Sequence, residues 1–187
     1  MPTRLLLPLA LIAVGSTFSA ARPIKTASSV VPDSCIVPPA ETARLLALSY
    51  EEFDTDSAQF SWRSLNSRNC TNEAIRLLER YTAARSAELS AGQKSEAAFH
   101  AGQALTFANR NEEAIAYFEK ALAMAREDEW STYVMAHLAY ARGDLASLRR
   151  ATEHYAEIAP GSMRLGFLKG LLACPQKPYM EAAHCRP

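Results

Sequence analysis

The feature that most constrains the fold is a long stretch without proline, from Ala40 to Ala159. Its glycines are Gly92, Gly102 and Gly143. Proline is largely excluded from helix interiors, whereas Ala, Leu, Glu and Arg, which are frequent here, have high helix propensities. No segment alternates polar and β-branched residues as a half-buried strand would. The sequence therefore predicts an all-α fold.

Apolar residues recur at helical spacing along this stretch and just after it. In segment 72–89, for example, Ala74, Leu77 and Tyr81 share one face. Such faces must pack against one another, so several amphipathic helices around a common core are expected. The predicted helices cover residues 40–53, a short piece around 60–65, and then 72–89, 95–108, 111–125, 130–141, 145–158 and 162–173.

Residues 1–21 have the pattern of a secretory signal peptide. Arg4 gives a positive start, residues 5–14 are an apolar run, and Ser19-Ala20-Ala21 supplies the small residues of a cleavage site. As a helix this run would cross only about half of a bilayer core. We expect cleavage after Ala21, with Ser19 and Ala20 as alternatives. The mature chain should then be exported, to the bacterial periplasm or the extracellular space, without membrane insertion.

The remainder of the chain divides into three parts by composition. Residues 22–38 contain several prolines and serines and no apolar period, which predicts an extended arm or linker. Residues 39–173 form the predicted helical domain, and residues 174–187 form a C-terminal tail. A structural role, in which the arm tethers the domain to a larger assembly, is one alternative to a binding function.

The four cysteines are an even number in a chain expected to be exported, which favours two disulfides. Three pairings are possible, and the local one, Cys35 with Cys70 and Cys174 with Cys185, is the simplest. The Cys174–Cys185 disulfide would close a loop within the C-terminal tail. A zinc site formed by cysteines and His184 lacks the usual ligand spacing. We therefore expect no metal site.

Charge and motifs exclude several classes of function. The chain has 20 Lys+Arg and 20 Asp+Glu, so it lacks the basic excess of a nucleic-acid-binding protein, and no nucleic-acid partner is expected. It contains no HExxH, GxSxG, P-loop or glycine-rich dinucleotide turn, so no catalytic residue and no cofactor is predicted. An enzyme without these motifs is the alternative to a non-catalytic protein. It would be an exported hydrolase with paired carboxylates in a helical cleft, because such chemistry needs only two acids.

Small residues recur with a period of 34 at Gly102, Ala136 and Gly170, each within the first helix of a predicted pair. Small side chains at such places let neighbouring helices approach closely. The helix after Gly102 carries Ala114 and Phe118, and Ala121 follows one turn later. This small–aromatic–small pattern after a small residue resembles the tetratricopeptide repeat (TPR). Helical hairpins of another lineage are the alternative.

The resemblance implies antiparallel helical hairpins stacked as a short right-handed TPR-like solenoid, with residues 163–173 as a C-terminal capping helix. In that family, first helices line a concave groove that receives a peptide or protein partner, without catalysis. So few repeats imply modest affinity, or a homodimer that extends the groove. Carried over residue by residue, the partner-binding positions are Phe99, Gln103, Thr106, Trp130, Tyr133, His137 and Tyr140.

Aromatic residues at helical spacing also commonly pack in protein cores. For Phe99 and Tyr133, contact with a neighbouring helix is therefore the alternative to contact with a partner.

Overall fold

A computed structural model describes residues 32–186 of the chain. The predicted signal peptide and the first part of the predicted arm lie outside the described residues. Within residues 32–186 all regular structure is helical, which confirms the predicted all-α class, and no helix there is long and apolar enough to cross a membrane. The elements are η1 (Asp33–Cys35), α1 (Pro39–Ala47), α2 (Tyr50–Thr55), α3 (Trp62–Ser67), α4 (Thr71–Ala84), α5 (Ala91–Phe107), α6 (Asn111–Met124), α7 (Asp128–Arg142), α8 (Leu145–Ile158), α9 (Met163–Ala173) and α10 (Tyr179–Ala183).

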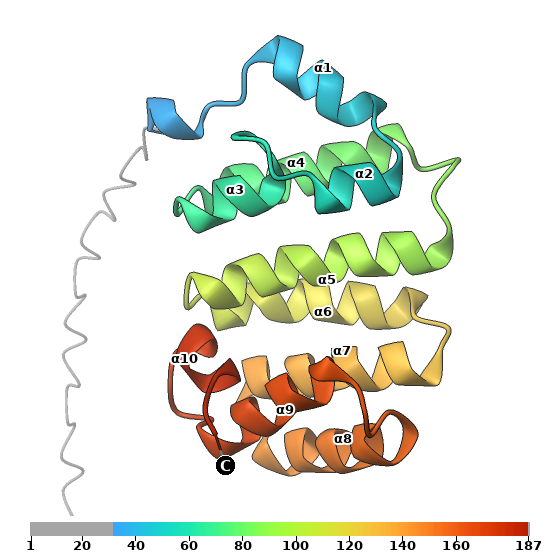
Figure 1. Cartoon of the computed structure of the whole chain (residues 1–187), viewed down its shortest axis with the longest axis vertical. Helices are drawn as coiled ribbons and strands as arrows, with labels where there is room; N and C mark the ends of the chain where they lie inside the picture. The colour runs from blue at the N-terminus through green and yellow to red at the C-terminus, as the bar shows by residue number, and fades with distance from the viewer. Residues whose placement is uncertain (1–31, 187) are drawn as a thin grey trace, which may run out of the picture. The chain divides into compact units, whose positions relative to one another are not determined.

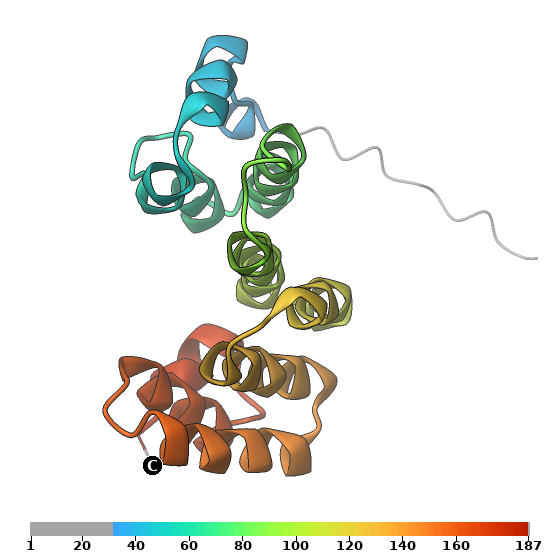
Figure 2. The same ribbon diagram turned by 90° about the vertical axis from the view of Figure 1, so that its right-hand side faces the viewer.

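Successive helices from α3 to α9 pack on their neighbours in the sequence (Figure 1). Helices α5 and α6 form one antiparallel hairpin, and α7 and α8 form the next, with α6 also packed on α7. The main helices run nearly parallel or antiparallel, so several are seen end-on in Figure 2. The core lies between them and includes the fully buried side chains of Tyr81, Phe118, Leu148 and Tyr155.

The helix predicted over residues 40–53 is two helices, α1 and α2, because Ser49 begins a new one. The Ser49 side chain accepts a hydrogen bond from the backbone N–H of Glu52, and the Glu52 carboxylate accepts one from the backbone N–H of Ser49. This reciprocal capping box satisfies backbone donors that a new helix leaves free. Hydrogen bonds from Ser49 also lower the pKa of the Glu52 carboxyl.

The helix predicted over residues 72–89 ends earlier, at Ala84. Arg85 follows it, and its guanidinium donates to the carbonyl oxygens of Leu46 and Leu48 at 3.2 and 3.0 Å. The hydroxyl of Tyr81 donates to the same Leu48 oxygen over 2.8 Å. These bonds tie the end of α4 to the break between α1 and α2.

Two glycines of the 34-residue period stand where another element approaches closely. A Cβ added at Gly102 would lie 2.8 Å from the ring of Phe118 in α6. A Cβ added at Gly170 would lie 2.7 Å from the carbonyl oxygens of Ala182 and Ala183 at the end of α10. At both positions, the lack of a side chain on glycine makes room for the next helix in the sequence, α6 beside Gly102 and α10 beside Gly170.

The structure contains both disulfides in the local pairing, Cys35–Cys70 and Cys174–Cys185. The second disulfide closes a segment, residues 174–185, that includes the short helix α10. We call it the C-terminal segment. The sequence predicts a tail over residues 174–187, and α10 is a helix that this prediction does not contain.

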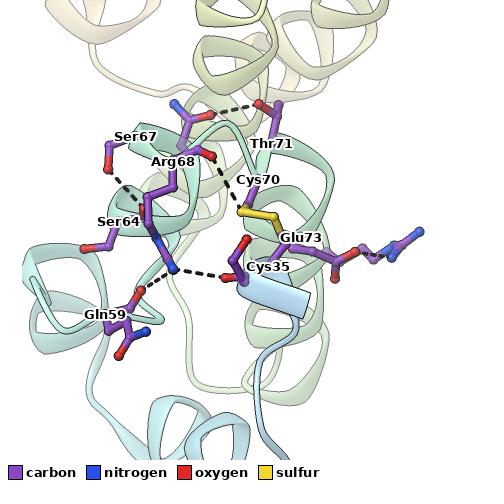
Figure 3. The surroundings of a disulfide bond; sticks show 11 residues. Cys35, Gln59, Ser64, Ser67, Arg68, Cys70, Thr71 and Glu73 are labelled. Carbon is purple, nitrogen blue, oxygen red and sulfur yellow. Dashed lines mark hydrogen bonds and ion pairs between the residues drawn. A yellow bond between two sulfur atoms is a disulfide. The ribbon is translucent and has the colours of Figure 1, made fainter. Parts of the chain in front are cut away.

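Arg68 follows the last residue of α3, and its side chain lies beside the first disulfide (Figure 3). Its guanidinium donates to the carbonyl oxygens of Ser34, Gln59 and Ser64, at 3.0, 2.6 and 3.1 Å respectively. The short helix η1 is thus held by a covalent bond at Cys35 and by a charged side chain. The end of the predicted arm is thereby attached to the helical domain.

Candidate functional site

The side chains predicted to bind a partner come from two neighbouring helices, α5 and α7. Residues three or four apart lie on the same face of a helix, so each helix contributes a short row. The two helices are the first members of successive hairpins. We call this surface the α5–α7 face; its members are Phe99, Gln103, Thr106, Trp130, Tyr133, His137 and Tyr140.

Tyr179 of α10 is bound to the α5–α7 face by its hydroxyl group. Nδ1 of His137 lies 2.9 Å from the carbonyl oxygen of Tyr133, which can only accept, so the ring proton of neutral His137 is on Nδ1. Nε2 then accepts a hydrogen bond from the Tyr179 hydroxyl over 2.8 Å. The side-chain amide of Gln103 donates to the same hydroxyl oxygen over 3.2 Å. One phenol thus joins α10 to both α5 and α7.

A second contact lies in the turn before α10. The hydroxyl of Tyr140 donates to the carbonyl oxygen of Lys177 over 2.7 Å. The ring of Tyr179 lies edge-on to that of Tyr140, with centroids 5.6 Å apart, and 5.2 Å from the ring of Phe107. The face therefore holds this segment through one main-chain carbonyl and one aromatic side chain.

Burial controls the charge state of the groups on this face. His137 is 0% exposed, and its burial lowers the pKa of the imidazole from 6.5 to about 4. Burial likewise raises the pKa of the Tyr133 hydroxyl to about 12. The His137 imidazole and the Tyr133 hydroxyl are therefore both neutral at pH 7. A neutral His137 is consistent with the hydrogen bond that its Nε2 accepts from the Tyr179 hydroxyl.

The expectation of an open groove over the whole α5–α7 face is corrected by the structure. The rings of Phe99 and His137 lie edge-on with centroids 4.9 Å apart, and the Phe99 and Tyr133 centroids are 5.4 Å apart, so these side chains form core contacts. The C-terminal segment covers much of the remainder. The buried members are Phe99, Thr106, Tyr133, His137 and Tyr140, whereas Gln103 and Trp130 are partly exposed.

One end of the face stays open, at the first turns of α5, α7 and α9. A pocket of about 350 Å³ there is lined by Glu96, Arg126, Trp130 and Arg164, among others. The guanidinium carbon of Arg164 lies 5.2 Å from the Trp130 ring centroid. The indole N–H of Trp130 donates to the hydroxyl of Ser95 over 2.8 Å, which fixes the ring at the edge of the pocket. The pocket combines an aromatic surface with charges of both signs.

A second cluster lies where α2 packs near the first half of α5. Glu96 and His100 are four residues apart on α5 and project to one side, and Asp54 comes from the end of α2. One ligand-type atom from each of these three side chains lies within 4.8 Å of the others. His100 is 9% exposed, whereas Asp54 and Glu96 are partly exposed. These residue types are those that bind divalent metal ions.

Neighbouring side chains hold the members of this cluster in place. Arg63 donates to Oδ2 and to the carbonyl oxygen of Asp54, both over 2.7 Å. Its guanidinium lies over the Trp62 ring, 4.1 Å from the centroid, and Trp62 stacks on the imidazole of His100 with centroids 4.6 Å apart. Contacts with His100 and Arg63 lower the pKa of the Asp54 carboxyl although burial opposes this. Asp54 is therefore ionised at neutral pH.

The sequence does not predict this cluster, because the metal site weighed there is one of cysteines with His184. The signal that the sequence does contain is the spacing of Glu96 and His100, which places two ligand types on one face of a predicted helix. Asp54 could not be found in this way, because it lies on another helix and joins the cluster only through tertiary packing.

A hydrolase with paired carboxylates needs a carboxyl group whose pKa is strongly raised within a pocket. Among residues 32–186, every carboxyl group with a shifted pKa is shifted downward, by hydrogen bonds or by a nearby positive charge. These groups are Glu52, Asp54, Asp56, Glu113 and Asp144. Such carboxylates stay ionised and do not act as general acids at neutral pH.

In comparisons with known proteins, no protein-family model, curated protein or solved structure matches the chain.

Proposed function

We propose that the chain is an exported, TPR-like interaction module that binds a peptide or protein segment at the α5–α7 face. Recognition would need no chemistry and no cofactor. Contact would begin in the open pocket beside Trp130, where an aromatic ring and two arginines are available. Aromatic and arginine side chains at the edge of a preformed pocket are typical anchors of protein interfaces.

The observation that carries this proposal is the way the face holds the C-terminal segment. Lys177 is bound through its main-chain carbonyl, and Tyr179 through a buried side chain with two hydrogen-bond partners. A surface with this donor and acceptor pattern is suited to an extended peptide that presents a carbonyl and a phenol. The intramolecular segment occupies one end, and a partner would occupy the other.

The proposal includes a specific arrangement of the helices. The hairpins α5–α6 and α7–α8, together with the 34-residue period of small residues, support a short right-handed TPR-like solenoid with α9 as its capping helix. So small an array gives modest affinity unless a homodimer extends the face.

Two disulfides support export through the predicted signal peptide to the periplasm or the extracellular space, because disulfides persist in oxidising compartments.

Site-specific photocrosslinking tests the proposal. The photoreactive amino acid p-benzoylphenylalanine replaces Trp130 in one variant and Met135 in the other, in the native host. Both residues lie on α7, but Met135 is 39% exposed on the side away from the pocket. We expect a discrete crosslinked partner from position 130 and none from position 135. No crosslink at 130, or the same products from both positions, would contradict the proposal.

A further inference from the structure

We infer that Asp54, Glu96 and His100 bind one divalent transition-metal ion, of which Zn²⁺ is the best probe. The site adjoins the proposed peptide contacts, because Glu96 belongs both to this cluster and to the lining of the open pocket. Its donors are one imidazole and two carboxylates, a set that favours zinc and similar ions over magnesium or calcium, which prefer oxygen ligands alone.

The first argument is the unpaired state of buried polar atoms. Both ring nitrogens of His100 and Oδ1 of Asp54 lack a hydrogen-bond partner, and so does the hydroxyl of Tyr50, which is 8% exposed. Nε2 of His100 lies 3.2 Å from Oδ1 of Asp54, but the approach does not have hydrogen-bond geometry. Buried polar groups are rarely left without a partner. A bound cation would satisfy Nε2 of His100 and Oδ1 of Asp54 together.

The second argument is distance. Zinc lies about 2.1 Å from nitrogen and oxygen ligands, and tetrahedral angles then place the ligand atoms roughly 3.4 Å apart. The 3.2 Å separation between His100 and Asp54 matches that edge, and Glu96 is within 4.8 Å of both. Only a small movement of the partly exposed Glu96 side chain is needed to complete the site.

The third argument is that the surroundings orient and balance these ligands. Arg63 binds Oδ2 of Asp54 and leaves Oδ1 directed to His100, and Trp62 stacks on the imidazole. Such supporting contacts are typical of built metal sites. The two carboxylates and the one guanidinium sum to a single negative charge, so a dication is attracted. Three protein ligands leave a fourth position of a tetrahedral ion for water or a small ligand.

The test is isothermal titration of Zn²⁺ into the full mature chain, prepared without a histidine tag and stripped of metals with a chelator. We expect one Zn²⁺ per chain and no comparable binding of Mg²⁺ or Ca²⁺. Glu96→Gln keeps the shape of the side chain and removes one ligand charge, so it should weaken binding by about 100-fold or more without unfolding the protein. Asp54→Asn and His100→Ala should do the same.

The matched control is His154, which also lies near two acids, Asp128 and Glu157, at 3.2 and 3.7 Å. Its side chain is 45% exposed, so His154→Ala should leave Zn²⁺ binding unchanged. Three results would overturn the inference. These are no Zn²⁺ binding by the folded wild type, Zn²⁺ affinity in Glu96→Gln equal to that of the wild type, or loss of binding in His154→Ala.

Discussion

The hydroxyl of Tyr179 donates to Nε2 of His137 over 2.8 Å, which joins the short helix α10 to the middle of α7. The bond is buried, since Tyr179 is 4% exposed and His137 is 0% exposed. His137 can accept it because Nδ1 carries the ring proton and donates a hydrogen bond to the carbonyl oxygen of Tyr133. The orientation of one imidazole thus determines how the C-terminal segment is held on the α5–α7 face.

Removal of this hydroxyl should destabilise the protein. In Tyr179→Phe, the buried Nε2 of His137 loses its donor, which costs about 1–3 kcal/mol of unfolding free energy. Tyr117→Phe is the control, because the hydroxyl of Tyr117 donates to the exposed Glu79 and water can replace it; its cost should be below about 1 kcal/mol. Urea unfolding measures both, and equal stability losses would contradict a buried bond at Tyr179.

Stability should fall in mild acid because of His137. Burial lowers the pKa of His137 to about 4, whereas the unfolded chain titrates near 6.5, so the unfolded state takes up its proton first. This group has no effect above about pH 6.5, and from there to pH 4 it destabilises the fold by up to roughly 3 kcal/mol. The carboxyl groups with lowered pKa values act mainly below about pH 4.5.

The measurement for this acid effect is urea unfolding of the wild type and His137→Gln at pH 7.5, 6.5, 5.5 and 4.5. The variant should have a much flatter profile between pH 6.5 and 4.5, whatever its stability at pH 7.5. A variant whose stability falls as steeply as that of the wild type would show that another group is responsible.

Two glycines of α9 should respond in opposite directions to the same substitution. Gly166→Ala adds a Cβ with nothing within 4 Å, so it should stabilise the helix by about 0.5–1 kcal/mol. Gly170→Ala adds a Cβ 2.7 Å from the backbone of Ala182 and Ala183, so it should destabilise the fold by roughly 1–3 kcal/mol. Thermal unfolding of both variants distinguishes them. A higher melting temperature for Gly170→Ala would mean that α10 does not pack there.

The two disulfides should stabilise the fold by different amounts. They span sequence separations of 35 and 11 residues, and the chain-entropy model gives about 4 and 3 kcal/mol for loops of these lengths. Replacement of Cys35 and Cys70 by serine should therefore cost more than the same change at Cys174 and Cys185. Chemical unfolding under oxidising conditions tests the order. A larger loss from the second pair would mean that strain or packing outweighs loop entropy.

The sequence alone predicts the helices best where amphipathic period and turn residues agree. Helix α8 matches its predicted range, and α9 differs from its prediction by one residue at its start. The break between α1 and α2 was missed because Ser49 interrupts an otherwise continuous helical pattern through side-chain capping alone. Helix α10 was missed because five residues are too few to show a period.

The candidate sites were harder to predict because both depend on contacts between distant residues. The apolar and aromatic pattern of α5 and α7 identifies an inward-facing surface, but it cannot tell which part is covered by a segment later in the chain. Tyr179 reaches His137 across 42 residues of sequence. In the same way, Asp54 meets His100 only after α2 packs near α5.

The central claim, that a partner binds the open end of the α5–α7 face, is tested most directly by affinity. The partner captured at position 130 is titrated against the wild type, Trp130→Ala, Arg164→Ala and the control Met135→Ala, after circular dichroism confirms that each is folded. We predict at least about 10-fold weaker binding for the first two variants and less than about 2-fold change for the control. Unchanged affinity in Trp130→Ala and Arg164→Ala, or a loss confined to Met135→Ala, would contradict the claim.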